Sequence, residues 1–110
     1  MQFFQIKTAL ESFRPHKIPD RRELPRAGTT VVIRPEGQGP APGPCVLLIK
    51  RAEHPLDPWS GHMSFPGGRM EPGDANVFEA AARETREETG LDVIEEADFI
   101  GRLSDVRAQT

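Results

Sequence analysis

The sequence has little cysteine and no long apolar run, and each absence excludes a class of protein. Cys45 is the only cysteine among 110 residues, so neither an intrachain disulfide nor a zinc site of several cysteines can form. No apolar stretch approaches the roughly 18 residues of a membrane span. The N-terminus, MQFFQIKTALESF, also lacks the parts of a secretory signal peptide. We therefore expect a cytoplasmic protein that has no membrane partner.

An excess of basic charge is absent as well. The chain carries 14 Lys and Arg against 17 Asp and Glu, a net charge of −3, and the basic residues form no patch. This argues against a nucleic-acid partner, whose binding would depend on neutralising phosphates. A hydrophobic content of 36% and a charged content of 28% are typical of a soluble globular protein. The length allows one small domain and leaves the oligomeric state open.

The spacing of apolar residues predicts the order of the elements. It indicates a helix from Phe3 to Phe13, then a lead-in interrupted by prolines that ends at Ala27. Residues 28–110 would form the main domain. Apolar and β-branched runs predict four strands: Thr29 to Arg34, Cys45 to Lys50, His62 to Phe65 and Phe99 to Leu103. We expect the second strand to be buried on both faces, with Cys45 in the core.

A second helix is predicted between Asn76 and Gly90. Asn76 can cap its N-terminus, with Glu79 reaching back as in a capping box, and Gly90 can end it. At about 100° per residue, one arc of roughly 60° forms the expected packing face; it contains Phe78, Ala82, Thr85 and Thr89. Glu84, Glu87 and Glu88 fall on the other side. Ala80 and Ala81 precede them there, and we expect these small residues to leave room for a ligand.

The three glutamates have two interpretations. Carboxylates three and four residues apart present hard oxygen ligands to one point, which suits Mg²⁺ or Mn²⁺. Alternatively, they form a solvated face, because Arg83 and Arg86 interleave with them as in an ordinary surface helix. The glycine turn at Gly67 and Gly68 favours the metal site, since glycine lets the backbone approach a ligand closely.

Together, the glycine turn and the helix resemble the signature of the Nudix hydrolases. That signature is Gly, five residues, Glu, seven residues, then Arg-Glu, apolar, any residue, Glu-Glu, any residue, Gly and apolar. Gly68 opens it here, and RETREETGL from Arg83 to Leu91 closes it. Asp74 replaces the first glutamate, and eight residues rather than seven precede Arg83. This variant resembles the coenzyme A pyrophosphatase subgroup, although Trp59 stands where that subgroup is expected to have histidine.

The resemblance implies an α/β (α+β) fold, an α/β/α sandwich around a mixed sheet. It implies Mg²⁺-dependent hydrolysis of a small-molecule substrate in which a nucleoside diphosphate is linked to another moiety, such as coenzyme A or ADP-ribose. It also implies a role for each matching residue. Glu84, Glu87, Glu88 and the Gly67 carbonyl would be metal ligands. Arg83 would orient the acids, Asp74 would support the loop, and Gly90 would end the helix. Glu87 and Glu88 are both candidates for the general base.

Three further residues are candidates for substrate binding. Arg51 follows a predicted strand and can contact phosphate, Gly68 lies in the turn, and Trp59 can stack on a nucleotide ring. Because the family has further strands and a second helix after its signature, the chain resembles only the front part of a Nudix domain. The alternative function is therefore a non-catalytic Nudix-like module that binds a nucleotide or a partner, or an inactive fragment.

Overall fold

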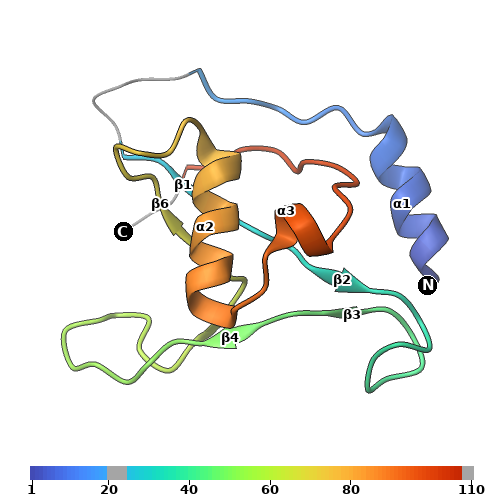
Figure 1. The fold of residues 1–110 in the computed structure, drawn as a ribbon, viewed down its shortest axis with the longest axis horizontal. Coiled ribbons are helices and arrows are strands. Elements are labelled where there is room, and N and C mark those ends of the chain that lie inside the picture. Colours follow the sequence, from blue (N-terminus) through green and yellow to red (C-terminus); the bar gives the residue numbers. More distant parts are fainter. Residues whose placement is uncertain (20–24, 108–110) are drawn as a thin grey trace.

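The computed structural model describes residues 1–19 and 25–107, and its elements follow the order shown in Figure 1. Helix α1 spans Phe3–Ser12, one residue short of the predicted end. The Glu36 carboxylate accepts a hydrogen bond from the Phe3 N–H at 2.8 Å, which satisfies one free donor of the first turn. None of the described helices is long and apolar enough to cross a bilayer.

Within the described residues, six short strands form three separate antiparallel pairs. Strand β1 (Ala27–Thr29) pairs with β6 (Gly67–Arg69), β2 (Ile33–Arg34) with β3 (Cys45–Val46), and β4 (Ile49–Lys50) with β5 (Met63–Ser64). Together with the helices, these strands confirm the predicted mixed α and β class. The shortest of the four predicted strands is reduced to β5.

Two strand predictions were wrong in length. The segment from Thr29 to Arg34 is divided between β1 and β2, and the segment from Cys45 to Lys50 between β3 and β4. The second segment is not buried on both faces, since Val46 is 49% exposed and Cys45 is half-buried. In the described chain β3 pairs only with β2 and β4 only with β5, so each half of the apolar run has one hydrogen-bonded neighbour where a central strand has two.

The predicted strand from Phe99 to Leu103 is also absent, because this segment is irregular. The Phe99 ring packs edge-on against Phe78, with the centroids 5.5 Å apart. Farther on, Asp105 donates its N–H to the carbonyl of His16 in the lead-in at 2.8 Å. This segment thus forms no strand, and its large apolar side chains stay exposed, Phe99 at 69% and Leu103 at 58%.

Helix α2 spans Val77–Thr89 and carries the glutamates. The Asn76 side chain accepts the Glu79 N–H at 2.9 Å, as expected of an N-cap. The Glu79 carboxylate accepts from Ala75, one residue before the position that a capping box requires. Gly90 ends the helix with φ of 80°, in the left-handed region that favours glycine. A short helix, α3 (Val93–Glu96), follows.

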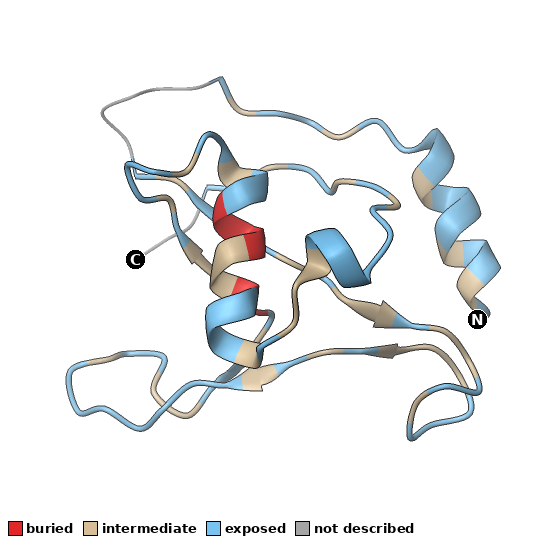
Figure 2. Cartoon of the chain, in the orientation of Figure 1, coloured by how far each residue is buried: buried red, intermediate tan, exposed pale blue. Residues whose placement is uncertain are grey.

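The core lies where α2 packs against β1 and β6 (Figures 1 and 2). Its buried residues are small: Pro66, Ala80, Ala81, Ala82 and Thr85. The Thr85 hydroxyl donates to the Ala81 carbonyl at 2.7 Å and is 3.0 Å from the Thr30 hydroxyl. A polar side chain at this apolar position of the signature is therefore hydrogen-bonded within the core.

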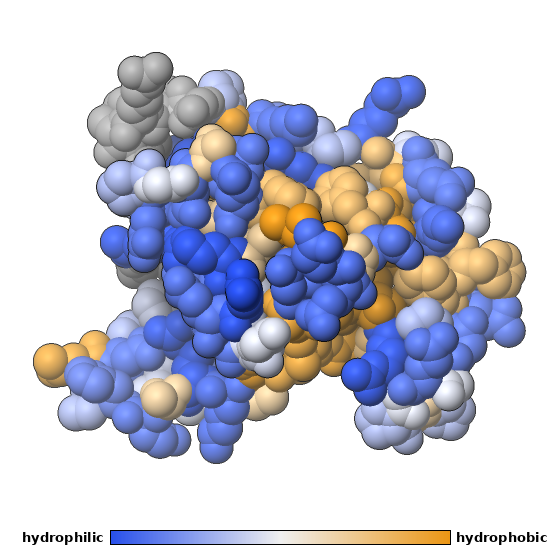
Figure 3. Space-filling model, viewed as in Figure 1, coloured by the Kyte–Doolittle hydropathy of each residue, from blue (hydrophilic) through white to orange (hydrophobic). Residues whose placement is uncertain are grey.

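The prediction for two alanines was wrong. Ala80 is 0% and Ala81 7% exposed, so they contact the sheet and leave no room for a ligand. Ala82 and Thr85 do lie in the core, but Phe78 is 47% exposed. The helix meets the sheet along its alanines because β1 offers Gly28, where an added Cβ would lie 3.1 Å from that of Ala81. Figure 3 shows hydrophilic side chains over α2 and apolar ones between α2 and α1.

Candidate active site

Arg83 joins the loop before α2 to the helix. Its Nε and Nη2 donate to the two oxygens of Asp74 at 3.0 and 2.8 Å, and Nη2 also donates to the Arg69 carbonyl at 3.1 Å. The Asp74 side chain is 7% exposed. The guanidinium, with the Glu71 N–H, holds the pKa of Asp74 below its usual range, and the Asp74 carboxylate raises the pKa of Arg83. This two-point contact fixes the orientation of the guanidinium.

The same guanidinium gathers two of the predicted metal ligands. Nη1 of Arg83 donates to Glu84 Oε1 at 2.9 Å and lies 3.3 Å from both carboxylate oxygens of Glu87. Two acids one turn apart therefore converge on a single positive group, which offsets their mutual repulsion. Arg83 thus contacts both acids, and its orienting role stays a prediction.

The glycine turn lies against these acids. An added Cβ at Gly68 would be 2.6 Å from the Glu84 carboxyl carbon, and one at Gly67 would collide with the backbone of Gly28 and Thr29 in β1. The Gly67 N–H donates to Glu88 Oε1 at 2.9 Å. All three glutamates thus lie beside Arg83 or the turn, and the absence of a side chain at Gly68 permits the approach of Glu84.

These contacts bear on whether the residues suit a divalent cation. Within the described part of the chain, no three Asp, Glu, His or Cys side chains stand together as a metal site. The donors nevertheless suit such an ion chemically, because they are carboxylates and two of them already surround one positive charge. Glu88, held by Gly67, is the third of the set.

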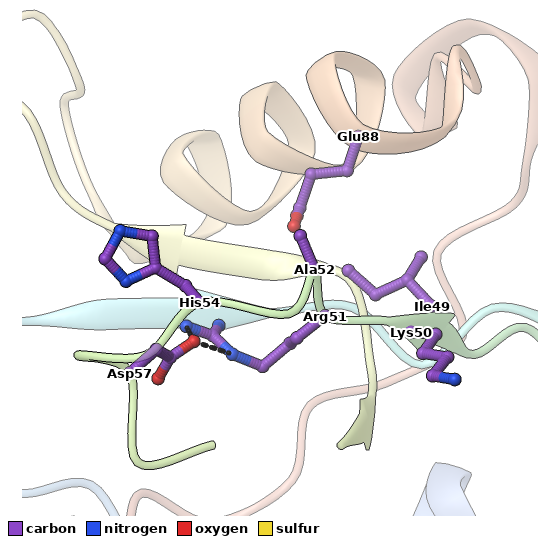
Figure 4. A pocket seen from close by; sticks show the side chains of 7 residues that line it. All are labelled: Ile49, Lys50, Arg51, Ala52, His54, Asp57 and Glu88. Carbon is purple, nitrogen blue, oxygen red and sulfur yellow. Dashed lines mark hydrogen bonds and ion pairs between the residues drawn. The ribbon is translucent and has the colours of Figure 1, made fainter. Parts of the chain in front are cut away.

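A pocket of about 540 Å³ lies between the end of α2 and the loop after β4 (Figure 4). Its lining residues are Ile49, Lys50, Arg51, Ala52, His54, Asp57 and Glu88. Its volume lies within the range of about 300–1,000 Å³ that is typical of small-molecule sites. Arg51 and Glu88, two residues singled out from the sequence, therefore share one cavity.

Asp57 is the residue of this pocket that the sequence analysis missed. Its Oδ2 accepts from Nε and Nη2 of Arg51 at 3.1 and 2.8 Å, and its Oδ1 accepts the Trp59 N–H at 3.0 Å. The Trp59 N–H, followed by Arg51, holds the pKa of Asp57 below its usual range. The Asp57-Pro58 pair was the available signal, since an Asp before Pro favours a turn closed by its own side chain.

Trp59 has a different place from the one that a stacking role requires. Its side chain is 44% exposed and is not among those lining the pocket; its backbone holds Asp57. His54 and Lys50 do line the pocket. The His54 Nδ1 accepts the Leu56 N–H at 3.2 Å, so the neutral ring carries its proton on Nε2. Stacking by Trp59 stays a prediction.

The comparison with protein families agrees with this geometry. The family model described as the NUDIX domain matches residues 24–110, which is most of the chain. The chain belongs to the Nudix family. No solved structure matches this Nudix domain significantly.

Curated relatives of this Nudix domain include named hydrolases. The mitochondrial coenzyme A diphosphatase NUDT8 of Homo sapiens is 45% identical over 53 residues, 48% of this chain and 22% of that protein. The uncharacterized Nudix hydrolase NudL of Yersinia enterocolitica is 38% identical over 61 residues, which are 56% of this chain and 27% of that protein.

An uncharacterized protein of Schizosaccharomyces pombe is 46% identical over 63 residues, 56% of this chain and 19% of that protein. The chain therefore spans about a fifth to a quarter of the length of the curated relatives it matches.

Proposed function

We propose that this Nudix domain hydrolyses the diphosphate bond of a small molecule in which a nucleoside diphosphate is linked to another moiety. The observation that carries the proposal is the convergence of Glu84 and Glu87 on Arg83, beside the glycine turn and the pocket that Glu88 lines. A substrate resembling coenzyme A is one candidate, since one relative is named a coenzyme A diphosphatase. ADP-ribose is another.

Glu84, Glu87 and Glu88 would hold a divalent cation, Mg²⁺ or Mn²⁺, and the Gly67 carbonyl is a further candidate ligand. When bound, the cation would lower the pKa of a water molecule and neutralise phosphate oxygens. Arg83 would keep two of the acids oriented, and Asp74 would keep Arg83 in place. Gly90 would keep the last turn of α2, which contains Glu87 and Glu88, from continuing into the next segment.

Two residues are candidates for taking the proton from the attacking water. Glu87 is exposed, with a side-chain accessibility of 58%, whereas Glu88 lines the pocket and accepts the Gly67 N–H. Its place in the pocket favours Glu88, because a general base must lie within hydrogen-bonding reach of the water it activates. Arg51 would bind a phosphate oxygen from the opposite wall. A cytoplasmic location stays a prediction.

The test is a hydrolysis screen of the full chain with Mg²⁺ or Mn²⁺, in which the phosphomonoester products are separated from the substrate by chromatography. The substrates are coenzyme A, ADP-ribose, dinucleoside polyphosphates and nucleoside triphosphates. With a confirmed substrate, Glu84→Gln, Glu87→Gln and Glu88→Gln should each lower turnover about 10²-fold or more without changing the circular dichroism spectrum. Glu95→Gln, an exposed acid on α3, is the matched control and should keep wild-type turnover.

Two results would contradict the proposal. Wild-type turnover in all three glutamine variants would show that Glu84, Glu87 and Glu88 do not form the active site. Absence of any hydrolysis, with no saturable heat on Mg²⁺ titration, would favour the alternative function, a non-catalytic Nudix-like module.

A further inference from the structure

Hydrogen bonds close the loop from Arg51 to His62. The Arg51 N–H donates to the His62 carbonyl at 2.9 Å, and the Gly61 N–H donates to the Arg51 carbonyl at 3.2 Å, so the two ends of the loop are paired. Inside the loop, the His54 N–H donates to the Ser60 hydroxyl at 2.7 Å. A side chain attached to this loop is therefore held in a defined place relative to β4.

Asp57 holds one such side chain. Its carboxylate is anchored by the Trp59 N–H on one oxygen and binds the Arg51 guanidinium with the other. The Asp57 side chain is 19% exposed and that of Arg51 45%, so the acid lies beneath the base. A guanidinium has five N–H donors; two point to Asp57, and the described residues supply no acceptor for the other three.

This arrangement suits a phosphate group better than a free arginine would. A flexible arginine loses conformational freedom when it binds a ligand, whereas one already held by a carboxylate loses less. Neutralisation by Asp57 weakens the long-range attraction, but the fork geometry that phosphate requires is preserved. Lys50 lines the same pocket and adds a positive charge of its own.

We propose that Asp57 is a positioning residue for phosphate recognition. It holds the Arg51 guanidinium in the wall of the pocket that Glu88 also lines, so that the remaining N–H groups bind a phosphate oxygen of the substrate. The proposal rests on the function proposed above, because it assumes that the pocket takes a diphosphate. Its test, however, measures binding and needs no turnover.

The experiment is calorimetric titration of the full chain with inorganic pyrophosphate, with and without Mg²⁺. Asp57→Asn should weaken pyrophosphate binding about five- to tenfold, the range expected for loss of one charge-assisted contact. Asp57→Glu should recover part of the loss. On a confirmed substrate, Asp57→Asn should raise KM by a similar factor and leave kcat nearly unchanged.

The chain provides a matched control pair. Asp105 binds Arg102 at 2.7 Å and, like Asp57, accepts a backbone N–H at 3.0 Å, that of Ile18. Neither residue lines the pocket. Asp105→Asn should therefore leave pyrophosphate binding at the wild-type value. An equal loss in Asp105→Asn and Asp57→Asn would overturn the proposal, because it would indicate a general structural effect.

Four other results would also overturn it. Equal or tighter binding by Asp57→Asn would show that the carboxylate only competes with phosphate, and failure of the wild type to bind pyrophosphate would remove the site. If Asp57→Asn does not fold, Arg51→Lys decides, since lysine keeps the charge without the fork and should bind more weakly. Unchanged affinity in Arg51→Lys contradicts positioning. Hydrolysis of a substrate with unchanged KM in Asp57→Asn would refute this inference and leave the proposed function standing.

Discussion

At the scale of single residues, the site depends on the lack of a side chain at Gly68. Gly68 leaves the space that the Glu84 carboxyl group occupies, because an added Cβ would be 2.6 Å from the carboxyl carbon. Glu84 is the end of a flexible side chain, so a methyl group at residue 68 would displace the carboxylate without disturbing the backbone. The position of the acid can thus be tested without changing its charge.

We expect Gly68→Ala to keep the fold and to lower turnover about 10- to 100-fold, since a displacement of about 1 Å can have an effect of this size. Saturable binding of Mg²⁺, measured by calorimetry, should weaken in parallel. Gly73→Ala is the matched control, because nothing lies within 4 Å of a Cβ added there. Equal behaviour of the two variants would show that the place of Glu84 is unimportant.

At the scale of elements, α2 is the part of the chain whose sequence specifies its structure most completely. Asn76 caps it, Gly90 ends it and Thr85 is buried at 0% exposure. The two ends of the helix rest on contacts within the helix or one turn away from it, which is why the sequence predicts them, whereas Thr85 also bonds the distant Thr30 hydroxyl. The end of the helix then determines which acids reach the glycine turn.

We expect Asn76→Ala to lower the free energy of unfolding by about 1 kcal/mol, the usual effect of removing an N-cap side chain. Asn76→Asp should keep the stability of the wild type, because its carboxylate can accept the same Glu79 N–H. Urea unfolding followed by circular dichroism measures both. If alanine and asparagine at this position give the same midpoint and slope, the cap contributes nothing.

Other parts of the fold could not be predicted because they depend on contacts distant in sequence. Ala81 was predicted on the exposed side of α2 but is buried, since its contact with Gly28 joins residues far apart in the sequence. The strand predicted from Phe99 to Leu103 is absent, and the Phe99 ring instead contacts Phe78 of α2. In the pocket, Arg51 was found from the sequence, whereas Asp57 required the loop geometry that brings it beneath the arginine.

At the scale of the whole molecule, the chain is open. Its accessible surface is 8697 Å², against about 6,100 Å² expected for a compact protein of this mass. Its radius of gyration is 15.1 Å, against about 13 Å. Large apolar side chains remain exposed, among them Val106 at 84% and Phe99 at 69%. Polar contacts nevertheless join several of its segments.

Three aspartates provide such contacts, and each combines an arginine with a backbone N–H. Asp57 closes the loop after β4, Asp74 ties the loop before α2 to the helix, and Asp105 joins the end of the described chain to the N–H of Ile18 in the lead-in. For Asp74 and Asp105 the arginine is the main cause of the lowered pKa, and for Asp57 it is the Trp59 N–H. All three pKa values are lower than the ordinary 3.8.

These shifts predict the direction of acid sensitivity. Because the folded carboxylates bind protons less readily than the unfolded ones, their contribution to stability is fully present well above pH 3.8 and is lost as pH falls through the lower folded values. Thermal unfolding midpoints measured from neutral to acidic pH should therefore fall in this window. Asp105→Asn should reduce the slope, whereas Asp98→Asn, an exposed acid outside these ion pairs, should leave it unchanged.

The close contact between α2 and β1 has a consequence for interpreting sequence variants. Gly28, Gly67 and Ala81 carry no reactive group. A side chain at Gly28 would collide with α2, and one at Gly67 would collide with β1. Inactive clones in a random library should therefore fall at these small residues as often as at the glutamates. A map of the positions where substitution abolishes activity would then outline the contact between helix and sheet. It would identify a reacting group only where the substitution leaves that contact intact.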